Sequence, residues 1–241
     1  MTLIIALACK QGLVFAADSQ ATESAPGLST RFPVEKIRPL GSSILWASSG
    51  DVGLFQQVDE AFARQTSPPW QQGIAELRTK LRYITVGVVK RSLDNSLPIP
   101  TTQQWHQGAI LFCGYTGSTQ KTHWLLELLT DGRNTRYEER GFHAIGSGTV
   151  FAQVAQAMLA HYDIKNRTLD EGIKIAYRVM DSAIEVAAAY IGPPIRIWTI
   201  SEGDVHNLTD DELQAVRDSV GLWKQLERET LQRTASSGSG A

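Results

Sequence analysis

Thr2, the residue behind Met1, could supply both a nucleophile and its base. Threonine is small enough for methionine aminopeptidase to remove Met1 in front of it. The exposed residue would carry its hydroxyl and a free α-amine on adjacent carbon atoms, and such an amine can accept the hydroxyl proton during attack. Taken alone, the position fits an ordinary strand start better, because threonine after methionine is common. The rest of the sequence is therefore needed to choose between a nucleophile and an ordinary strand residue.

Other catalytic and metal-binding patterns are missing from the sequence. Gly146-Ser147-Gly148 is not the GxSxG motif, a GxxxxGK[ST] loop is absent, and the five histidines show no ligand spacing. Cys9 and Cys113 stand far apart in apolar runs without a CxxC pair, which predicts buried, reduced thiols. We therefore expect neither a metal nor another cofactor.

Composition indicates a globular protein that can bury a large core. Of the 241 residues, 42% are hydrophobic and 20% are charged, and the formal net charge of -2 leaves no basic field for nucleic acid or anionic lipid. We expect one domain over residues 1–234 and a flexible tail over 235–241, ASSGSGA. The sequence lacks a signal-peptide pattern and any apolar run approaching ~18 residues, which favours the cytoplasm and excludes a membrane partner.

Short apolar runs predict strands on both sides of a first helical region. The first pair, 3–8 and 13–17, flanks the turn signal Lys10-Gln11-Gly12, and the second pair, 34–40 and 44–48, flanks Gly41-Ser42. Because these runs do not alternate with polar residues, we expect sheets that are buried on both faces. Later strands are expected at 109–113, 124–129, 135–139, 142–145, 195–200 and 205–206.

Helical periodicity and capping signals lie between these strands. Residues 51–65 and 72–91 repeat apolar positions every three or four residues, and 92–107 follow as a long loop. Capping boxes at 168–171 and 209–212 open two further helices, the second of which is terminal. A fifth helix is expected over 149–161, behind the Gly146-Ser147-Gly148 turn.

The order of these elements is strands, two helices, strands, two helices, strands and a helix. Segregated runs of this kind indicate an α+β fold rather than an alternating parallel sheet. Two helix pairs on opposite faces of two stacked sheets would make a four-layer αββα sandwich with an extended C-terminal helix.

Four motifs, in this order, resemble those of proteasome β-subunits, a branch of the N-terminal-nucleophile (Ntn) hydrolases. Thr2-Leu3-Ile4 with residues 12–19 (GLVFAADS) resembles the opening strand pair, and 33–37 (PVEKI) resembles the strand that carries the lysine. Residues 44–51 (ILWASSGD) resemble the oxyanion turn, and 144–148 (AIGSG) the late serine motif. Met1 without a longer propeptide and the long terminal helix resemble bacterial proteasome homologues.

The resemblance implies a role for each of five residues. Thr2 would be the nucleophile, and Lys36, held in place by Asp18, would disfavour protonation of the amine and stabilise an alkoxide. The Gly50 N–H would bind the oxyanion at a helix start, and Ser147 would hydrogen-bond the Thr2 amine. By type alone, Lys36 also fits a solvated strand lysine and Asp18 a turn aspartate. Gly50 likewise fits a tight-turn glycine, and Ser147 a helix N-cap.

The resemblance also implies a substrate pocket and shows one departure from the family. Val34, Arg38, Ser48 and Val52 would line the site for the residue before the scissile bond, and the small Ser48 would leave it deep. The family usually carries an Asp and a Ser three apart near the terminal amine. Here residues 185–194 read EVAAAYIGPP, with neither. Glu185 or main-chain carbonyls would have to replace them, or activity is reduced.

The function that the resemblance implies is that of a self-compartmentalising threonine peptidase. Copies of the chain would form one or two stacked rings, with Thr2 facing an inner chamber that receives peptide or unfolded protein. The sequence leaves open whether an ATP-driven unfoldase is a partner. Two alternatives also stay open: an Ntn amidase acting on small amides, and a ring scaffold with little or no activity.

Overall fold

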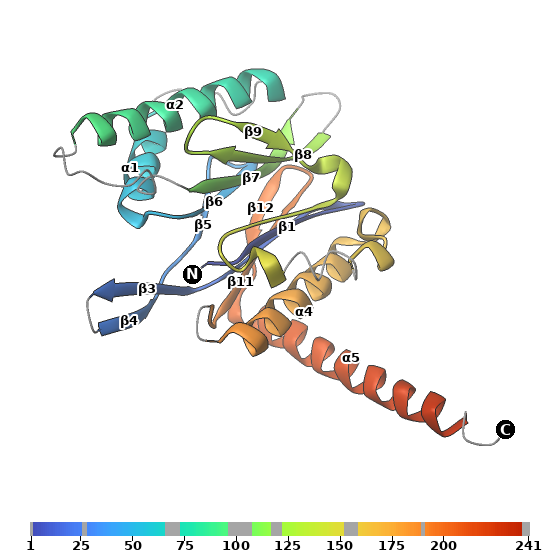
Figure 1. Cartoon of the computed structure of the whole chain (residues 1–241). Helices are drawn as coiled ribbons and strands as arrows, with labels where there is room; N and C mark the ends of the chain where they lie inside the picture. The colour runs from blue at the N-terminus through green and yellow to red at the C-terminus, as the bar shows by residue number, and fades with distance from the viewer. Residues whose placement is uncertain are drawn as a thin grey trace.

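The computed structural model describes residues 2–25, 28–65, 73–95, 108–116, 122–151, 159–188 and 191–237. Within these residues the strands form two five-stranded sheets and one two-stranded hairpin. Figure 1 shows the two sheets stacked in the middle, α1 and α2 outside one of them, and α4 and α5 outside the other.

The first sheet has the strand order β10-β1-β2-β11-β12, and its neighbouring strands are antiparallel. Every residue of β1 and β2 is buried, as their unalternating apolar runs predict. The expected hairpin of these two strands and the late pair β11 and β12 are confirmed. The bounds are β1 Ile4–Cys9, β2 Gly12–Asp18, β10 Phe142–Ile145, β11 Ile195–Ser201 and β12 Asp204–Asn207.

The second sheet has the strand order β5-β6-β7-β8-β9. Two expected strands are shorter here. The strand expected over 34–40 pairs only at β5, because the Val34 N–H turns to the Ser19 carbonyl (2.8 Å). The end of the strand expected over 135–139 is a 3-10 turn, Glu138–Arg140. The bounds are β5 Ile37–Pro39, β6 Ile44–Ser49, β7 Ala109–Thr116, β8 Thr122–Leu129 and β9 Asn134–Arg136.

A further hairpin, absent from our sequence predictions, extends from the end of the first sheet. Strand β3 (Gln20–Ala25) pairs with β4 (Leu28–Pro33) through six residues on each side. Its sequence is polar, so the apolar pattern gave no signal. The Pro26-Gly27 dipeptide, a frequent turn former, was the usable cue.

Two of the helices begin at the predicted capping boxes, and a third has an aspartate cap. The Asp51 carboxylate accepts from the Leu54 N–H (2.9 Å) to cap α1, and the capping boxes at Thr168 and Thr209 form as expected at α4 and α5. The bounds are α1 Val52–Ala63, α2 Ile74–Asp94, α4 Leu169–Ala187 and α5 Asp210–Ser237. Helical backbone is also present at 149–151 and 159–161, where a helix was expected, while 152–158 lie outside the described residues.

Two helices are longer than expected. Helix α2 continues to Asp94, since no breaker stands before Asn95, so the loop expected over 92–107 starts later; residues 96–107 lie outside the described part. Helix α5 continues to Ser237, so the first three residues of the expected tail 235–241 are helical. Beyond its packed first half, α5 projects away from the layers (Figure 1).

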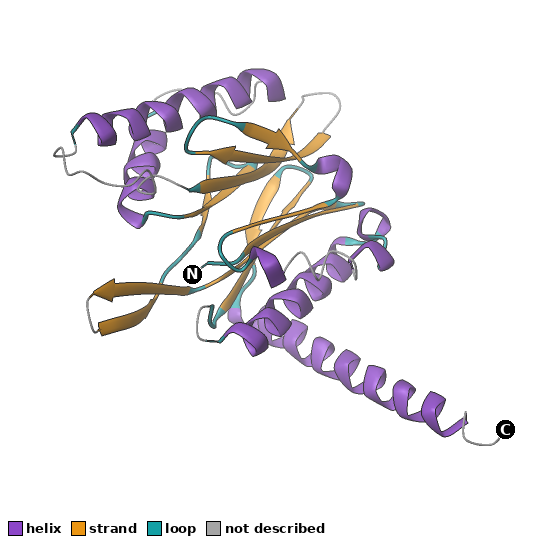
Figure 2. Cartoon of the chain, in the orientation of Figure 1, coloured by secondary structure: helices purple, strands orange, loops and turns teal. Residues whose placement is uncertain are grey.

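Three apolar layers hold the elements together, as Figure 2 shows for strands between helices. One lies between the two sheets and includes Phe15 and Leu111. The second joins α1 and α2 to the second sheet around Trp46, and the third joins α4 and α5 to the first sheet around Met180. The expected four-layer αββα sandwich with a long C-terminal helix is therefore confirmed. No helix in the described ranges combines the length and apolar character needed to span a membrane.

Candidate active site

Asp18 is a fully buried carboxylate at the end of β2, and main-chain and side-chain donors surround it. Its Oδ1 accepts from the Leu3 N–H (2.9 Å) and from Lys36 Nζ (2.6 Å). Its Oδ2 accepts from the N–H groups of Gln20 (3.2 Å) and Gly192 (3.4 Å). A buried charge needs such partners, because water cannot solvate it. Asp18 thereby joins the segment behind Thr2 to the lysine, as the sequence predicts.

Lys36 lies in the short connection between β4 and β5, with only 7% of its side chain exposed. Burial lowers the pKa of this ammonium below its ordinary value, although the charge and the hydrogen bond of Asp18 act in the opposite direction. The residue is therefore not the solvated strand lysine that its type alone also fits. Because its pKa is lowered, the Lys36 ammonium releases its proton more readily than an exposed lysine does.

Thr2 is held between the start of β1 and the turn that follows β10. Its N–H donates to Ser147 Oγ (3.2 Å), and its carbonyl accepts from the Gly148 N–H (3.0 Å). The structure thus brings Ser147 to the Thr2 nitrogen, as the resemblance implies.

Gly146 is a residue of this turn to which the sequence analysis gave no role. Its φ is +104°, and a Cβ added there would lie 2.1 Å from the Thr2 carbonyl oxygen. Only glycine fits this close approach. The two glycines that flank Ser147 were the available signal.

Gly50 forms the sharp turn between β6 and α1. Its φ of +135° is a conformation that favours glycine, and the next residue, Asp51, caps the helix. A main-chain N–H at such a helix start is oriented to stabilise negative charge. Gly50 lines one pocket together with Thr2 and Lys36. All five predicted catalytic residues therefore lie in one region, although each comes from a separate segment of the chain.

The four predicted substrate residues line this same pocket, which we call the nucleophile pocket. Its lining includes Val34, Arg38, Ser48, Val52, Thr2, Lys36 and Gly50. The depth expected behind Ser48 stays a prediction, but the volume of the pocket is small, about 70 Å³. Bulky side chains account for this: Arg38 forms an ion pair with Asp59 and lies 5.7 Å from the centre of the Trp46 ring.

The end of α4, where the family places its further Asp and Ser, has no acid directed at Thr2 in the described part. Glu185 accepts from Lys224 Nζ of α5 (2.7 Å), and this hydrogen bond lowers the pKa of its carboxyl. Glu185 is therefore engaged elsewhere, and the idea that it replaces the missing acid is wrong. Ala187 is buried in the core, and Tyr190 lies outside the described residues.

Side chains with possible metal-binding or nucleophilic chemistry also lie elsewhere among the described residues. No group of three or more His, Cys, Asp or Glu side chains that could hold a metal occurs among the described residues. Cys9 and Cys113 are buried free thiols, as expected. Burial raises the pKa of Cys9 to about 12 and raises that of Cys113 as well, so neither is a reactive thiolate near neutral pH.

Comparison with known proteins bears on the fold and the family of this chain. Among solved structures, Anbu (Gly-1) mutant from Hyphomicrobium sp. strain MC1 is 16% identical with a TM-score of 0.70, covering 96% of this chain and 97% of its own. Anbu (ancestral beta-subunit) from Yersinia bercovieri is 16% identical with a TM-score of 0.69, covering 95% and 97%. At this identity the likeness shows the fold alone. The family model of the proteasome subunit matches residues 2–200, a range that includes every candidate site residue, and the chain therefore belongs to the proteasome subunit family.

Proposed function

We propose that this chain is an N-terminal threonine endopeptidase that acts inside a ring of its own copies. The observation that carries the proposal is the set of contacts around Asp18 and Ser147. One carboxylate holds both the Leu3 N–H, next to Thr2, and the buried Lys36, while Ser147 accepts from the Thr2 nitrogen. A purely structural threonine has no need of a buried lysine beside it.

The proposed reaction starts once Met1 is removed and the Thr2 nitrogen is an amine. The amine, with a reference pKa of about 7.7 to 8.0, accepts the hydroxyl proton as the oxygen attacks a peptide carbonyl. The Lys36 cation disfavours protonation of the amine and stabilises the developing alkoxide. The Gly50 N–H binds the oxyanion, and the protonated Thr2 amine returns its proton to the leaving amine as the peptide C–N bond breaks. Water then hydrolyses the acyl ester on Thr2.

Assembly into a ring is supported by family membership and by the surface. Large apolar side chains are exposed on two outer helices, including Tyr83 of α2 (80% exposed) and Leu231 of α5 (70%). On α5, Leu222 and Leu226 are one turn apart and also exposed, and neighbouring exposed apolar side chains of this kind mark contacts with other chains. We propose one or two stacked homo-oligomeric rings. An ATP-driven unfoldase that supplies unfolded protein belongs to the same proposal.

The test combines assembly with substrate size. Light scattering at micromolar concentration should give several times the 26.5 kDa of one chain. The assembled protein should cleave internally quenched peptides, and Thr2→Ala should not. Hydrolysis of small amides without peptide cleavage would favour the amidase alternative. Assembly without either activity, in protein that has lost Met1, would favour the scaffold.

A further inference from the structure

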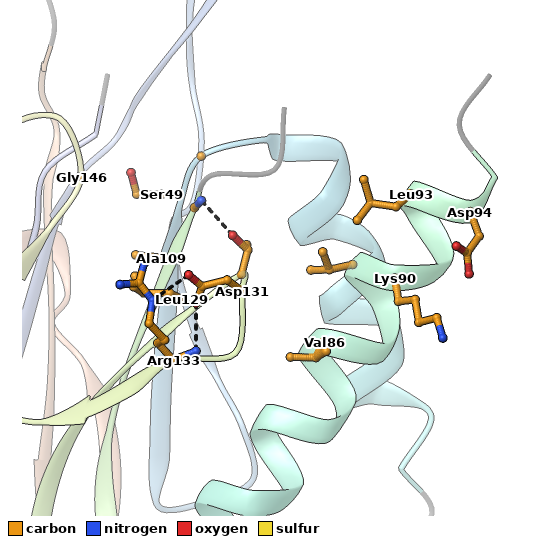
Figure 3. Close-up of a pocket in the computed structure, with 14 residues that line it drawn as sticks. Ser49, Val86, Lys90, Leu93, Asp94, Ala109, Leu129, Asp131, Arg133 and Gly146 are labelled. Carbon is orange, nitrogen blue, oxygen red and sulfur yellow. Dashed lines mark hydrogen bonds and ion pairs between the residues drawn. The ribbon is translucent and has the colours of Figure 1, made fainter. Parts of the chain in front are cut away.

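A second, much larger cavity begins at the same glycine as the nucleophile pocket. Its volume is about 1140 Å³, and its inner end is formed by Ser49, Gly50 and Gly146. Helix α2, the start of β7 and the turn between β8 and β9 form its sides (Figure 3). Gly50 is the residue that lines both cavities, whereas Ser48 lines only the narrow one and Ser49 only the wide one.

The backbone of β6 explains this division. Successive residues of a strand point to opposite faces, so Ser48 and Ser49 must point to different sides of the Gly50 turn. The wide cavity also lies close to the nucleophile. At Gly146, a Cβ would meet the Thr2 carbonyl at 2.1 Å and Ser49 Oγ at 3.3 Å. The two cavities therefore flank the position that the Gly50 N–H and Thr2 define.

The wall formed by α2 is apolar. It contributes Val86, Val89 and Leu93, and Leu93 is 49% exposed. In Figure 3, Val86 and Leu93 point toward the opposite wall, whereas Lys90 and Asp94 point away from it. An exposed leucine on an apolar wall gains stability when a ligand covers it.

The opposite wall is polar but internally paired. Arg133 Nε donates to Asp131 Oδ2 (2.7 Å), and the Arg133 N–H donates to Asp131 Oδ1 (2.9 Å). Because these two charges neutralise each other, this wall offers little attraction to a charged ligand. The cavity as a whole therefore fits a chain with apolar side chains.

We propose that this cavity, the leaving-side groove, binds the part of a peptide substrate that follows the scissile bond and selects large apolar side chains there. The inference rests on the proposed function. A substrate whose scissile carbonyl lies at the Gly50 N–H, with the preceding side chain in the nucleophile pocket, must continue on the other side of Gly50. The leaving-side groove begins there, and its volume exceeds that of one side chain several times over.

The first test measures binding without catalysis. Thr2→Ala protein is titrated calorimetrically with a Leu-Leu-Val amide and with its Asp-Leu-Val analogue. We expect the leucine peptide to bind about tenfold more tightly, which is the size of effect that burying one leucine gives. Leu93→Asp should remove this difference, Leu93→Met should retain it, and Thr79→Asp, at an exposed position of α2 outside the groove, should leave it unchanged.

The second test measures the same preference during cleavage. Two internally quenched peptides share every residue before the scissile bond and carry Leu or Asp after it. We expect kcat/KM of the wild type to favour leucine about tenfold and Leu93→Asp to abolish the ratio. If wild type and Leu93→Asp prefer leucine over aspartate equally, in either test, the groove assignment is wrong. Thr2-dependent cleavage in the same experiment would still support the proposed function. Leucine-selective binding without any Thr2-dependent cleavage would instead contradict the proposed function and support the groove assignment.

Discussion

Thr2 is held on two sides by very different means. On the side of Lys36, the fully buried Asp18 accepts four hydrogen bonds, from three main-chain N–H groups and one ammonium. On the side of its nitrogen, one hydroxyl, Ser147 Oγ, accepts at 3.2 Å. The acid nearest in sequence to the family's usual position, Glu185, is paired with Lys224 of the projecting helix α5.

This difference shows which half of the site depends on the fold and which on local contacts. Asp18 ties together β1, β2, β3 and the segment before β11, so its geometry is fixed by the sheet. The amine side depends on a single turn after β10, which glycines on both sides of Ser147 allow to approach Thr2 closely. We therefore expect variants on the Asp18 side to affect both stability and rate, and variants on the Ser147 side to affect rate alone.

The largest effect should follow from Asp18→Ala. The change leaves the Lys36 ammonium buried without its counter-charge and leaves the Leu3 N–H unpaired. Breaking a buried ion pair in this way lowers the free energy of unfolding by ~3–5 kcal/mol. Thermal and urea denaturation measure the change. Glu185→Ala, whose side chain is 63% exposed, is the control and should lower stability by no more than ~1 kcal/mol. Equal losses of unfolding free energy in the two variants would contradict the claim that the contacts of Asp18 stabilise the fold.

A large loss of rate should follow from Lys36→Ala. Removal of one fixed electrostatic group at an oxyanion or alkoxide lowers kcat by ~10² to 10³. Assembly, measured by light scattering, should persist because Lys36 lies within its own chain's site. Lys80→Ala, on α2 and outside both cavities, serves as a matched control. Near-wild-type turnover of Lys36→Ala would point to another arrangement of the base.

Ser147→Ala should have a smaller effect, confined to turnover. The amine would lose its side-chain acceptor but keep its place through the Gly148 N–H bond to the Thr2 carbonyl. Loss of one neutral hydrogen bond corresponds to about a tenfold fall in kcat. Ser219→Ala, which removes a hydroxyl from the exposed face of α5, is the control. A drop as large as that of Lys36→Ala would mean that the two sides matter equally.

The smallest effect should be a shift in pH dependence. Because burial lowers the pKa of Lys36 below its ordinary 10.5, the cation is lost as pH rises through that lowered value. The alkaline limit of kcat/KM should therefore fall below the ordinary lysine value. In Lys36→Arg, any remaining activity should lose this limit, since arginine stays charged. A profile with the same alkaline limit in both proteins would assign it to another group.

Local patterns in the sequence predicted much of the fold. Strands β1 and β2 are apolar throughout, and both capping boxes use residues three apart, so neither required knowledge of distant contacts. The β3–β4 hairpin escaped prediction because its residues are polar and its two strands pair only with each other, outside both five-stranded sheets. The extension of α2 was missed because residues 92–94 have the composition of a loop, although they continue the helix.

The site was predicted less completely, because parts of it depend on long-range contacts. The resemblance supplied Thr2, Asp18 and Lys36 together. The small nucleophile pocket is bordered by Arg38, which pairs with Asp59, 21 positions away. Glu185 is engaged by Lys224, 39 positions away, and not by Thr2. Local sequence patterns do not predict pairs between residues that lie so far apart in the chain.

The central claim, that Thr2 is a terminal nucleophile, has a direct measurement. Natively expressed protein is analysed by intact mass before and after incubation with a threonine-reactive epoxyketone. The account predicts a chain without Met1 that gains a single adduct, and Thr2→Ala that gains none. Quantitative retention of Met1 with undiminished peptidase activity, or an equal adduct on Thr2→Ala, would contradict it.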